Sequence, residues 1–274
     1  MTKDLNKKIT LYSIIAFGIT WTIAFGIIWL LRNKTINDNQ LNFYHSFAAI
    51  GPTIAAIVTS YLFYGKQGIW KLFAKLKFHL PNNKTILLSI SPLLFFITGL
   101  LVFKIVKSDY YNFDAFSKLN WSSFNPFIIW LLPLLTYSVF EEIGWRGFLL
   151  PHLQQNFSAW KSTIILTVIW ALWHIPFFFY RFDFSLGITI GFFFGIFVGA
   201  VILTSIYNSS KGFLIPAMTF HFLNNFCSEF DKEIIVAVLS TGFVFIAICI
   251  IKKLGTNNLS LTDRQGNYFI SEEK

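Results

Sequence analysis

The chain has 274 residues, of which 55% are hydrophobic, 19% aromatic and 13% charged, and its mean hydropathy is +0.59. This composition excludes an ordinary soluble enzyme and predicts a polytopic membrane protein. The net charge of +9 does not indicate a nucleic-acid partner, because the basic residues are spread among short loops. The two cysteines, Cys227 and Cys249, lie in unlike apolar segments, so the sequence predicts neither a disulfide framework nor a cysteine metal site.

Eight apolar runs are long enough to cross a bilayer as helices. They cover about residues 11–31, 43–64, 85–106, 126–150, 160–179, 184–207, 213–230 and 234–251. We therefore predict an all-α fold, a polytopic membrane helical bundle of about eight transmembrane helices. No repeat or soluble domain interrupts it, so residues 1–274 are predicted to form a single membrane domain.

Several local patterns carry further predictions. Gly51-Pro52 interrupts the second predicted span, where we expect a kink. Residues 66–80 interleave lysines with large apolar side chains, which predicts either a basic amphipathic helix on an anionic membrane surface or an ordinary loop. Glycines spaced four apart in the sixth span predict close approach of another helix: Gly187, Gly191, Gly195 and Gly199. The tail after Lys253 is predicted to be a short solvated end.

The distribution of basic residues predicts the orientation. With the N-terminus inside, the inner segments carry fourteen Lys and Arg residues and the outer segments carry seven. Because cytoplasmic loops carry the excess of Lys and Arg, we expect a multi-pass protein of the cell membrane with both termini in the cytoplasm.

Three ionisable side chains lie inside the predicted fourth span: Glu141, Glu142 and Arg146. Each Asp, Lys or Arg at the centre of a membrane helix costs about 2.5–3.5 kcal/mol, and we expect glutamate to be similar. Glu142 and Arg146 are four residues apart on one helix face, so a salt bridge is predicted. Glu141 points about 100° away, toward no cation. We identify Glu141 as a candidate general base, and the alternative is a structural ion pair that fixes helix packing.

Two of the five histidines, His174 and His221, lie within predicted spans near the level of the acids. The other three lie near span ends or loops: His45, His79 and His152. A single membrane histidine is often only an interhelical hydrogen-bonding group, but two of them with Glu141 form a candidate site. Asn225 follows His221 by one helical turn, so both project from the same face.

Two mechanisms fit these groups. In the first, Glu141 takes a proton from a water molecule oriented by His174, while His221 and Asn225 donate to the tetrahedral intermediate. In the second, Glu141, His174 and His221 bind a divalent metal ion, with zinc as the first candidate, which activates the water. Both stay open, because the sequence does not decide whether a metal is bound.

At these residues the chain resembles the CAAX-protease and bacteriocin-processing (CPBP) family of membrane proteases, which includes the Ras-converting-type prenyl endopeptidases. The family motifs E-E-x-x-x-R, F-x-x-x-H and H-x-x-x-N appear here in order, as Glu141-Glu142 with Arg146, Trp170 with His174, and His221 with Asn225. Trp170 stands where the family usually has phenylalanine. The resemblance implies a catalytic core at about residues 126–230.

The resemblance implies an intramembrane endopeptidase, expected to be a metalloendopeptidase, that hydrolyses membrane-associated or lipidated peptides and proteins. Glu141 would activate the water, and Glu142 with Arg146 would be its structural partner. The expected partners are the lipid bilayer and a peptide or lipidated protein substrate. Two rival functions use the same residues: a non-catalytic bacteriocin-immunity or scaffold protein, and a transporter coupled to protons or cations.

Overall fold

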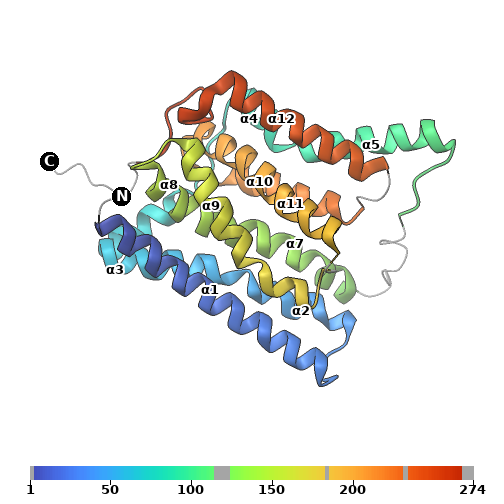
Figure 1. The fold of residues 1–274 in the computed structure, drawn as a ribbon, viewed down its shortest axis with the longest axis horizontal. Coiled ribbons are helices and arrows are strands. Elements are labelled where there is room, and N and C mark those ends of the chain that lie inside the picture. The colour runs from blue at the N-terminus through green and yellow to red at the C-terminus, as the bar shows by residue number, and fades with distance from the viewer. Residues whose placement is uncertain (1–2, 114–123, 183–184, 231–233, 267–274) are drawn as a thin grey trace.

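The computed structural model describes residues 3–113, 124–182, 185–230 and 234–266, and every regular element in these ranges is helical (Figure 1). The predicted all-α class is confirmed. The elements are α1 (Lys3–Arg32), α2 (Asp38–Ala48), α3 (Ile50–Ala74), α4 (Asn83–Ser89), α5 (Ser91–Lys107), α7 (Phe124–Gly144), the π-helix η1 (Trp145–Leu149), α8 (Leu150–Gln154), α9 (Ala159–Trp173), the 3₁₀-helix η2 (Ile175–Phe179), α10 (Leu186–Ser209), α11 (Ile215–Ser228) and α12 (Ile234–Asn258).

Six helical stretches in the described ranges are long and apolar enough to cross a membrane, and α4 with α5 makes a seventh if this pair, bent by 56°, is one span. The expected seventh span is instead α11, whose 14 residues fall short of the roughly 20 that a bilayer requires. The prediction of about eight spans is therefore approximate. The start of α1 and the end of α12 lie at the same end of the bundle (Figure 1).

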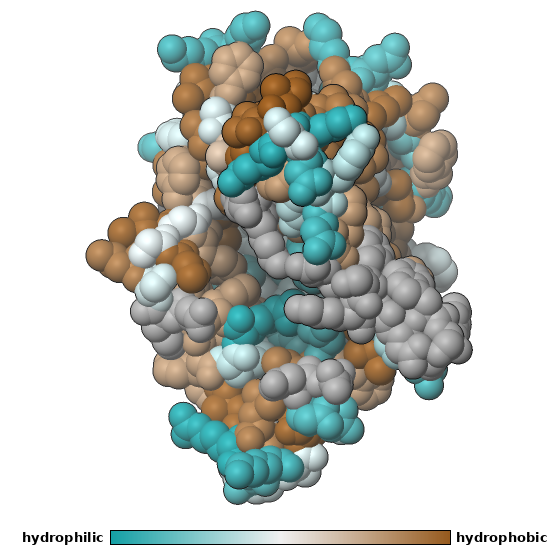
Figure 2. Space-filling model, turned by 90° about the vertical axis from the view of Figure 1, so that its right-hand side faces the viewer, coloured by the Kyte–Doolittle hydropathy of each residue, from teal (hydrophilic) through white to brown (hydrophobic). Residues whose placement is uncertain are grey.

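The surface carries many large apolar side chains, as expected for a protein surrounded by lipid. Trp29, Ile105 and Phe245 are each more than 60% exposed, although they lie on three different helices. Figure 2, which views the end of the bundle opposite the start of α1, shows hydrophobic side chains at the outline of the molecule beside hydrophilic ones. Exposed apolar area on this scale indicates contact with a membrane.

Two glycines allow α3 to pack closely between α1 and α7. A Cβ atom at Gly51 would lie 2.7 Å from the carbonyl oxygen of Ala16 on α1. A Cβ atom at Gly144, on α7, would lie 2.4 Å from the Cβ atom of Pro52 on α3. Real Cβ atoms do not approach other atoms so closely, so the two helix crossings depend on these glycines. The expected break near Gly51-Pro52 lies at Ala49, between α2 and α3.

The glycine stripe on α10 does not have the predicted packing role. A Cβ atom at any of its four positions would meet no described atom within 4 Å: Gly187, Gly191, Gly195 and Gly199. Helix α10 packs instead through its second half, where Ala200 to Asn208 are buried. The stripe therefore lies on an open face, and the prediction of a close contact was wrong for the described part of the chain.

The basic segment after the second span is helical as far as Ala74. Gly65, at φ +62°, breaks α3 and starts a new helical direction. Trp70 is 75% exposed, whereas Leu72 and Lys75 are buried against the bundle. The amphipathic helix predicted over residues 66–80 therefore exists over its first part and buries one of its lysines.

Part of the tail is packed against the bundle. Leu259 and Ser260 are buried, and the amide of Asn208 on α10 binds the backbone of Asn258 and Gln265. The same amide forms two hydrogen bonds with Gln154 on α8. The expectation of a solvated end was therefore wrong for the buried residues Leu259, Ser260 and Gly266, because buried amides hold the tail to the ends of α8 and α10, whereas Leu261 and Asp263 are exposed.

Candidate active site

The acidic motif lies where α7 passes into the π-helix η1. The backbone N–H of Leu150 donates to the carbonyl of Trp145, five residues earlier, which widens this turn. Gly147 lets this turn lie close to α3, because a Cβ atom at this position would come within 3.1 Å of a methyl group of Leu72. Such π turns occur mostly at functional sites. The turn brings Arg146 into the middle of the bundle, where its side chain is fully buried.

The predicted salt bridge between Glu142 and Arg146 is present. The Nη1 atom of Arg146 lies 2.9 Å from Oε1 of Glu142, and both side chains are 0% exposed. The same oxygen accepts a hydrogen bond from Nδ1 of His221, at 2.8 Å. Glu142 therefore does more than neutralise Arg146, since it also orients an imidazole that α11 supplies.

The carboxylate of Glu141 lies apart from this ion pair and is 1% exposed. Its Oε2 atom accepts a hydrogen bond from the indole of Trp145, at 2.9 Å, and another from the indole of Trp170 on α9. Among the described residues, no hydrogen bond reaches Oε1. The structure therefore agrees with the view that no cation pairs with Glu141, and it adds two neutral donors.

His174 is the residue that ends α9. Its Nδ1 atom lies 2.8 Å from the carbonyl oxygen of Trp170, one helical turn earlier. A carbonyl can only accept, so Nδ1 carries the hydrogen and Nε2 of the neutral ring is an acceptor. The ring packs edge-on against Phe177 of η2 and Phe192 of α10.

The two imidazoles and Glu141 are neighbours. Each histidine is within electrostatic range of the other, and His221 is within range of Glu141. The Trp170 ring is a neighbour of both imidazole rings, with centroid distances of 5.8 Å to His174 and 5.9 Å to His221. Because Nδ1 of each ring is held, both Nε2 atoms stay available. The structure thus brings together groups from α7, α9 and α11.

Asn225 is the least engaged of the predicted site residues. It lies one turn after His221 on α11 and is half-buried. It takes part in no hydrogen bond among the described residues. The structure therefore keeps it on the expected face without giving it a partner.

Sequence reasoning missed a tyrosine on α1. Tyr12 is fully buried, stacks on Phe148 at 5.1 Å, and lies within electrostatic range of Glu141 and Arg146. Its hydroxyl has no partner in the described structure, and neither have Nε and Nη2 of Arg146. Unpaired buried polar atoms usually hold ordered water. No sequence motif could have linked a residue 129 positions before Glu141 to this site.

A second missed group surrounds His45, which the sequence placed only near a helix end. His45 is buried, and its Nδ1 atom lies 2.7 Å from the hydroxyl of Tyr180 and 3.1 Å from that of Tyr137. Tyr137 precedes Glu141 by one turn of α7. The four-residue spacing could have placed Tyr137 on the same face of α7 as Glu141. The contact of His45 with Tyr137 joins residues 92 positions apart, so the sequence could not have predicted it.

The side chains do not form a ready metal site. Among the described residues, no group of three His, Cys, Asp or Glu side chains is placed to hold a metal ion. The held Nδ1 atoms do not argue against ligation, because a metal-ligating histidine usually donates its other N–H to a carbonyl or carboxylate, and Oε1 of Glu141 is also left without a donor. In the described conformation the ligand set predicted from Glu141, His174 and His221 is not gathered around one point, and we derive no chemical step through a metal.

Comparison with known proteins gives two matches to this part of the chain. Residues 123–227 match the family described as type II CAAX prenyl endopeptidase Rce1-like. CAAX prenyl protease 2 of Methanococcus maripaludis is 33% identical over 132 residues, which cover 44% of this chain and 47% of that protein. The match thus spans about half the length of this curated relative, and the family match includes every predicted site residue.

Proposed function

We propose that this chain is an intramembrane endopeptidase, because its residues 123–227 match the type II CAAX prenyl endopeptidase Rce1-like family and it is similar to a CAAX prenyl protease 2. The observation that carries the proposal is the shared oxygen of Glu142, which binds both Arg146 and His221. One buried carboxylate thereby holds an imidazole within electrostatic range of a second carboxylate, Glu141, which pairs with no cation among the described residues. This arrangement is typical of an active site, since a structural ion pair would need only Glu142 and Arg146.

We propose that Glu141 is the general base. Its Oε1 atom removes a proton from water, and the hydroxide oxygen bonds to the carbonyl carbon of the scissile peptide. The Nε2 atom of His174 accepts a hydrogen bond from the same water and orients it. Collapse of the tetrahedral intermediate breaks the C–N bond, and Glu141 returns the proton to the leaving amine.

His221 and Asn225 are the proposed oxyanion donors. In the imidazolium form, in which both ring nitrogens carry hydrogen, His221 donates from Nε2 to the developing oxyanion while its Nδ1 hydrogen stays on Glu142. Asn225 donates from its amide, which no described residue engages. Removing one such donor from a hydrolase typically lowers kcat by about 10²–10³ fold.

The proposed substrates are membrane-associated or lipidated peptides and proteins. The relative's printed name refers to prenylated CAAX tails, and a bacterial peptide or membrane-protein substrate is the alternative that we favour from composition. A site buried among six or seven membrane-crossing helices suits a substrate that is itself anchored in the bilayer. We propose a cell-membrane location with both termini in the cytoplasm.

Glu141→Gln tests the proposed function in the full-length protein reconstituted into lipid nanodiscs. The amide oxygen still accepts from both indoles but cannot take a proton, so we expect cleavage of a panel of prenylated, acylated and helix-anchored peptides to be abolished with an unchanged thermal midpoint. Glu229→Gln is the matched control, because Glu229 also accepts from an indole, that of Trp130, in a separate cluster. Wild-type protein that leaves the whole panel intact would contradict the proposal.

A further inference from the structure

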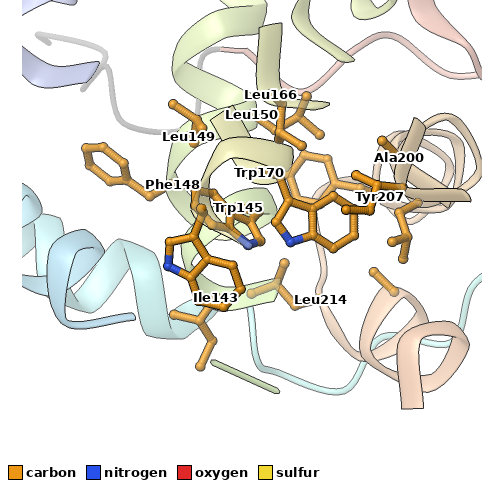
Figure 3. Close-up of a cluster of buried hydrophobic side chains, with 14 of the residues drawn as sticks. Ile143, Trp145, Phe148, Leu149, Leu150, Leu166, Trp170, Ala200, Tyr207 and Leu214 are labelled. Carbon is orange, nitrogen blue, oxygen red and sulfur yellow. The ribbon is translucent and has the colours of Figure 1, made fainter. Parts of the chain in front are cut away.

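The indole of Trp170 lies beside four ionisable groups of the proposed site, those of Glu141, Arg146, His174 and His221. Its N–H donates to Oε2 of Glu141, and its ring lies 4.6 Å from the guanidinium carbon of Arg146. Its ring also neighbours both imidazoles, and its own carbonyl holds His174. Trp170 is 5% exposed and belongs to the main buried cluster (Figure 3).

Trp145 binds the same oxygen of Glu141 from another direction. It follows Glu141 by four residues, and its Nε1 atom lies 2.9 Å from Oε2. Figure 3 shows Trp145 and Trp170 in one cluster, although they come from η1 and α9. Two donors that converge on one oxygen prevent the carboxylate from rotating and leave Oε1 as the oxygen without a donor.

Packing alone does not require these N–H groups. Trp173 is equally buried, stacks edge-on against Trp145 at 5.8 Å, and has an Nε1 atom with no acceptor in the described structure. The cluster therefore tolerates an indole whose nitrogen is unused. A phenylalanine at position 170 would keep a ring beneath Arg146 but would lose the donor to Glu141. The nitrogen of Trp170 thus serves Glu141 specifically.

We propose that Trp170 and Trp145 are positioning residues that hold Oε2 of Glu141, so that Oε1 alone receives the proton of the reacting water. This inference rests on the proposed function. Both indole N–H groups donate to Oε2 of Glu141, so we expect them to affect the chemical step rather than substrate binding. The N–H donors are charge-assisted when Glu141 is ionised, which makes them stronger than a neutral pair.

The first test compares three single substitutions in the full-length protein: Trp170→Phe, Trp145→Phe and Trp173→Phe. We expect the first two to lower kcat by about ten-fold or more, with KM within about two-fold, because a hydrogen bond to a charged group is lost while the ring remains. Trp173→Phe removes an unused N–H and should leave both constants unchanged. Full kcat in Trp170→Phe, or an equal loss in Trp173→Phe, would overturn the proposal.

The second test does not depend on activity. In the wild-type background, Trp170→Phe should lower the thermal midpoint by about 2–6 °C. In a Glu141→Ala background the acceptor is already gone, so the same substitution should leave the midpoint unchanged or raise it. Equal shifts in both backgrounds would refute the contact. A coupled shift in a protein that cleaves no peptide would retain the contact and reject the proposed function.

Discussion

At the scale of single residues, the site depends on which atom of each polar side chain is already bound. Both histidines are held by Nδ1, so Nε2 is the atom left for chemistry. Glu142 uses one oxygen for two partners, while its Oε2 atom is buried without a partner in the described structure. An isolated charge in this position would be strongly destabilising, so Arg146 neutralises Glu142 and holds its carboxylate in place.

Arg146→Ala should lower the free energy of unfolding by about 3–5 kcal/mol, because Glu142 would be left buried with only His221 as a partner. Thermal unfolding in detergent measures the effect. Arg32→Ala is the control, since Arg32 lies exposed at the end of α1. A thermal midpoint of Arg146→Ala equal to that of the control would show that the pair does not stabilise the fold.

Metal removal tests whether Glu141, His174 and His221 bind a metal ion. The predicted ligands do not converge in the described structure, so we expect purified protein to hold less than one zinc per chain and a chelator to leave peptide cleavage unchanged. Elemental analysis with chelation and zinc add-back measures this. Loss of cleavage on chelation that zinc restores would instead support the zinc site predicted from Glu141, His174 and His221.

At the scale of helices, α3 determines the position of the acidic motif. It contacts α1 through Gly51 and α7 through Gly144, and the hydroxyl of Thr53 donates to the carbonyl of Phe140 at 2.7 Å. These contacts lie within one turn before and after Glu141. The relation between α3 and α7 therefore sets where the end of α7, and with it the carboxylate of Glu141, lies relative to the histidines.

Gly144→Ala should destabilise the protein by about 1–3 kcal/mol, because its new methyl group would overlap Pro52 and push α3 from α7. Gly195→Ala is the matched control on α10, where the methyl group meets open space, and a helical alanine is favoured over glycine. Thermal midpoints and peptide cleavage measure both variants. Equal behaviour of the two would mean that the crossing of α3 and α7 is not tightly packed.

At the scale of the whole molecule, the ends of α3, α8, α10 and α12 meet in a polar layer away from the catalytic groups. Lys75 follows α3 and is buried, and its Nζ atom donates to the hydroxyl of Tyr207 at 2.5 Å. The backbone N–H of Leu214 binds the carbonyl of Lys75, and Asn208 holds the tail. This layer ties the first half of the chain to the last.

Stability should depend on pH through Lys75. Burial lowers the pKa of Lys75 from 10.5 to about 7. Between pH 7 and about 10 the unfolded chain therefore binds the proton that the folded chain releases, so this residue makes stability rise with pH in that window. Lys75→Met should be more stable than wild type near pH 7, and the difference should narrow toward pH 10.

Thermal midpoints across this pH range measure the dependence. Lys77→Met is the control, because Lys77 lies exposed two residues later and should leave the pH dependence of the wild type unchanged. A constant difference between Lys75→Met and wild type at all pH values would mean that Lys75 is charged in the folded protein throughout the range.

The amino-acid sequence was enough to predict the fold class, the candidate site residues and the ion pair of Glu142 with Arg146. These depend on local rules, because apolar length predicts a membrane helix and a spacing of four residues predicts a shared face. The spacing also placed Trp145 beside Glu141. It could not show that the indole would donate to the carboxylate, since that depends on the side-chain rotamer.

Which distant groups meet depends on how the helices pack, and the sequence did not predict it. The pairing of His221 with Glu142 joins residues 79 positions apart, and Trp170 reaches Glu141 across 29. The glycines of α10 obey a packing pattern but face open space, whereas Gly51 and Gly144 carry no such pattern and form the close crossings. Helical periodicity identifies the face of a helix that a residue occupies, but the partner opposite that face depends on how all the helices pack together.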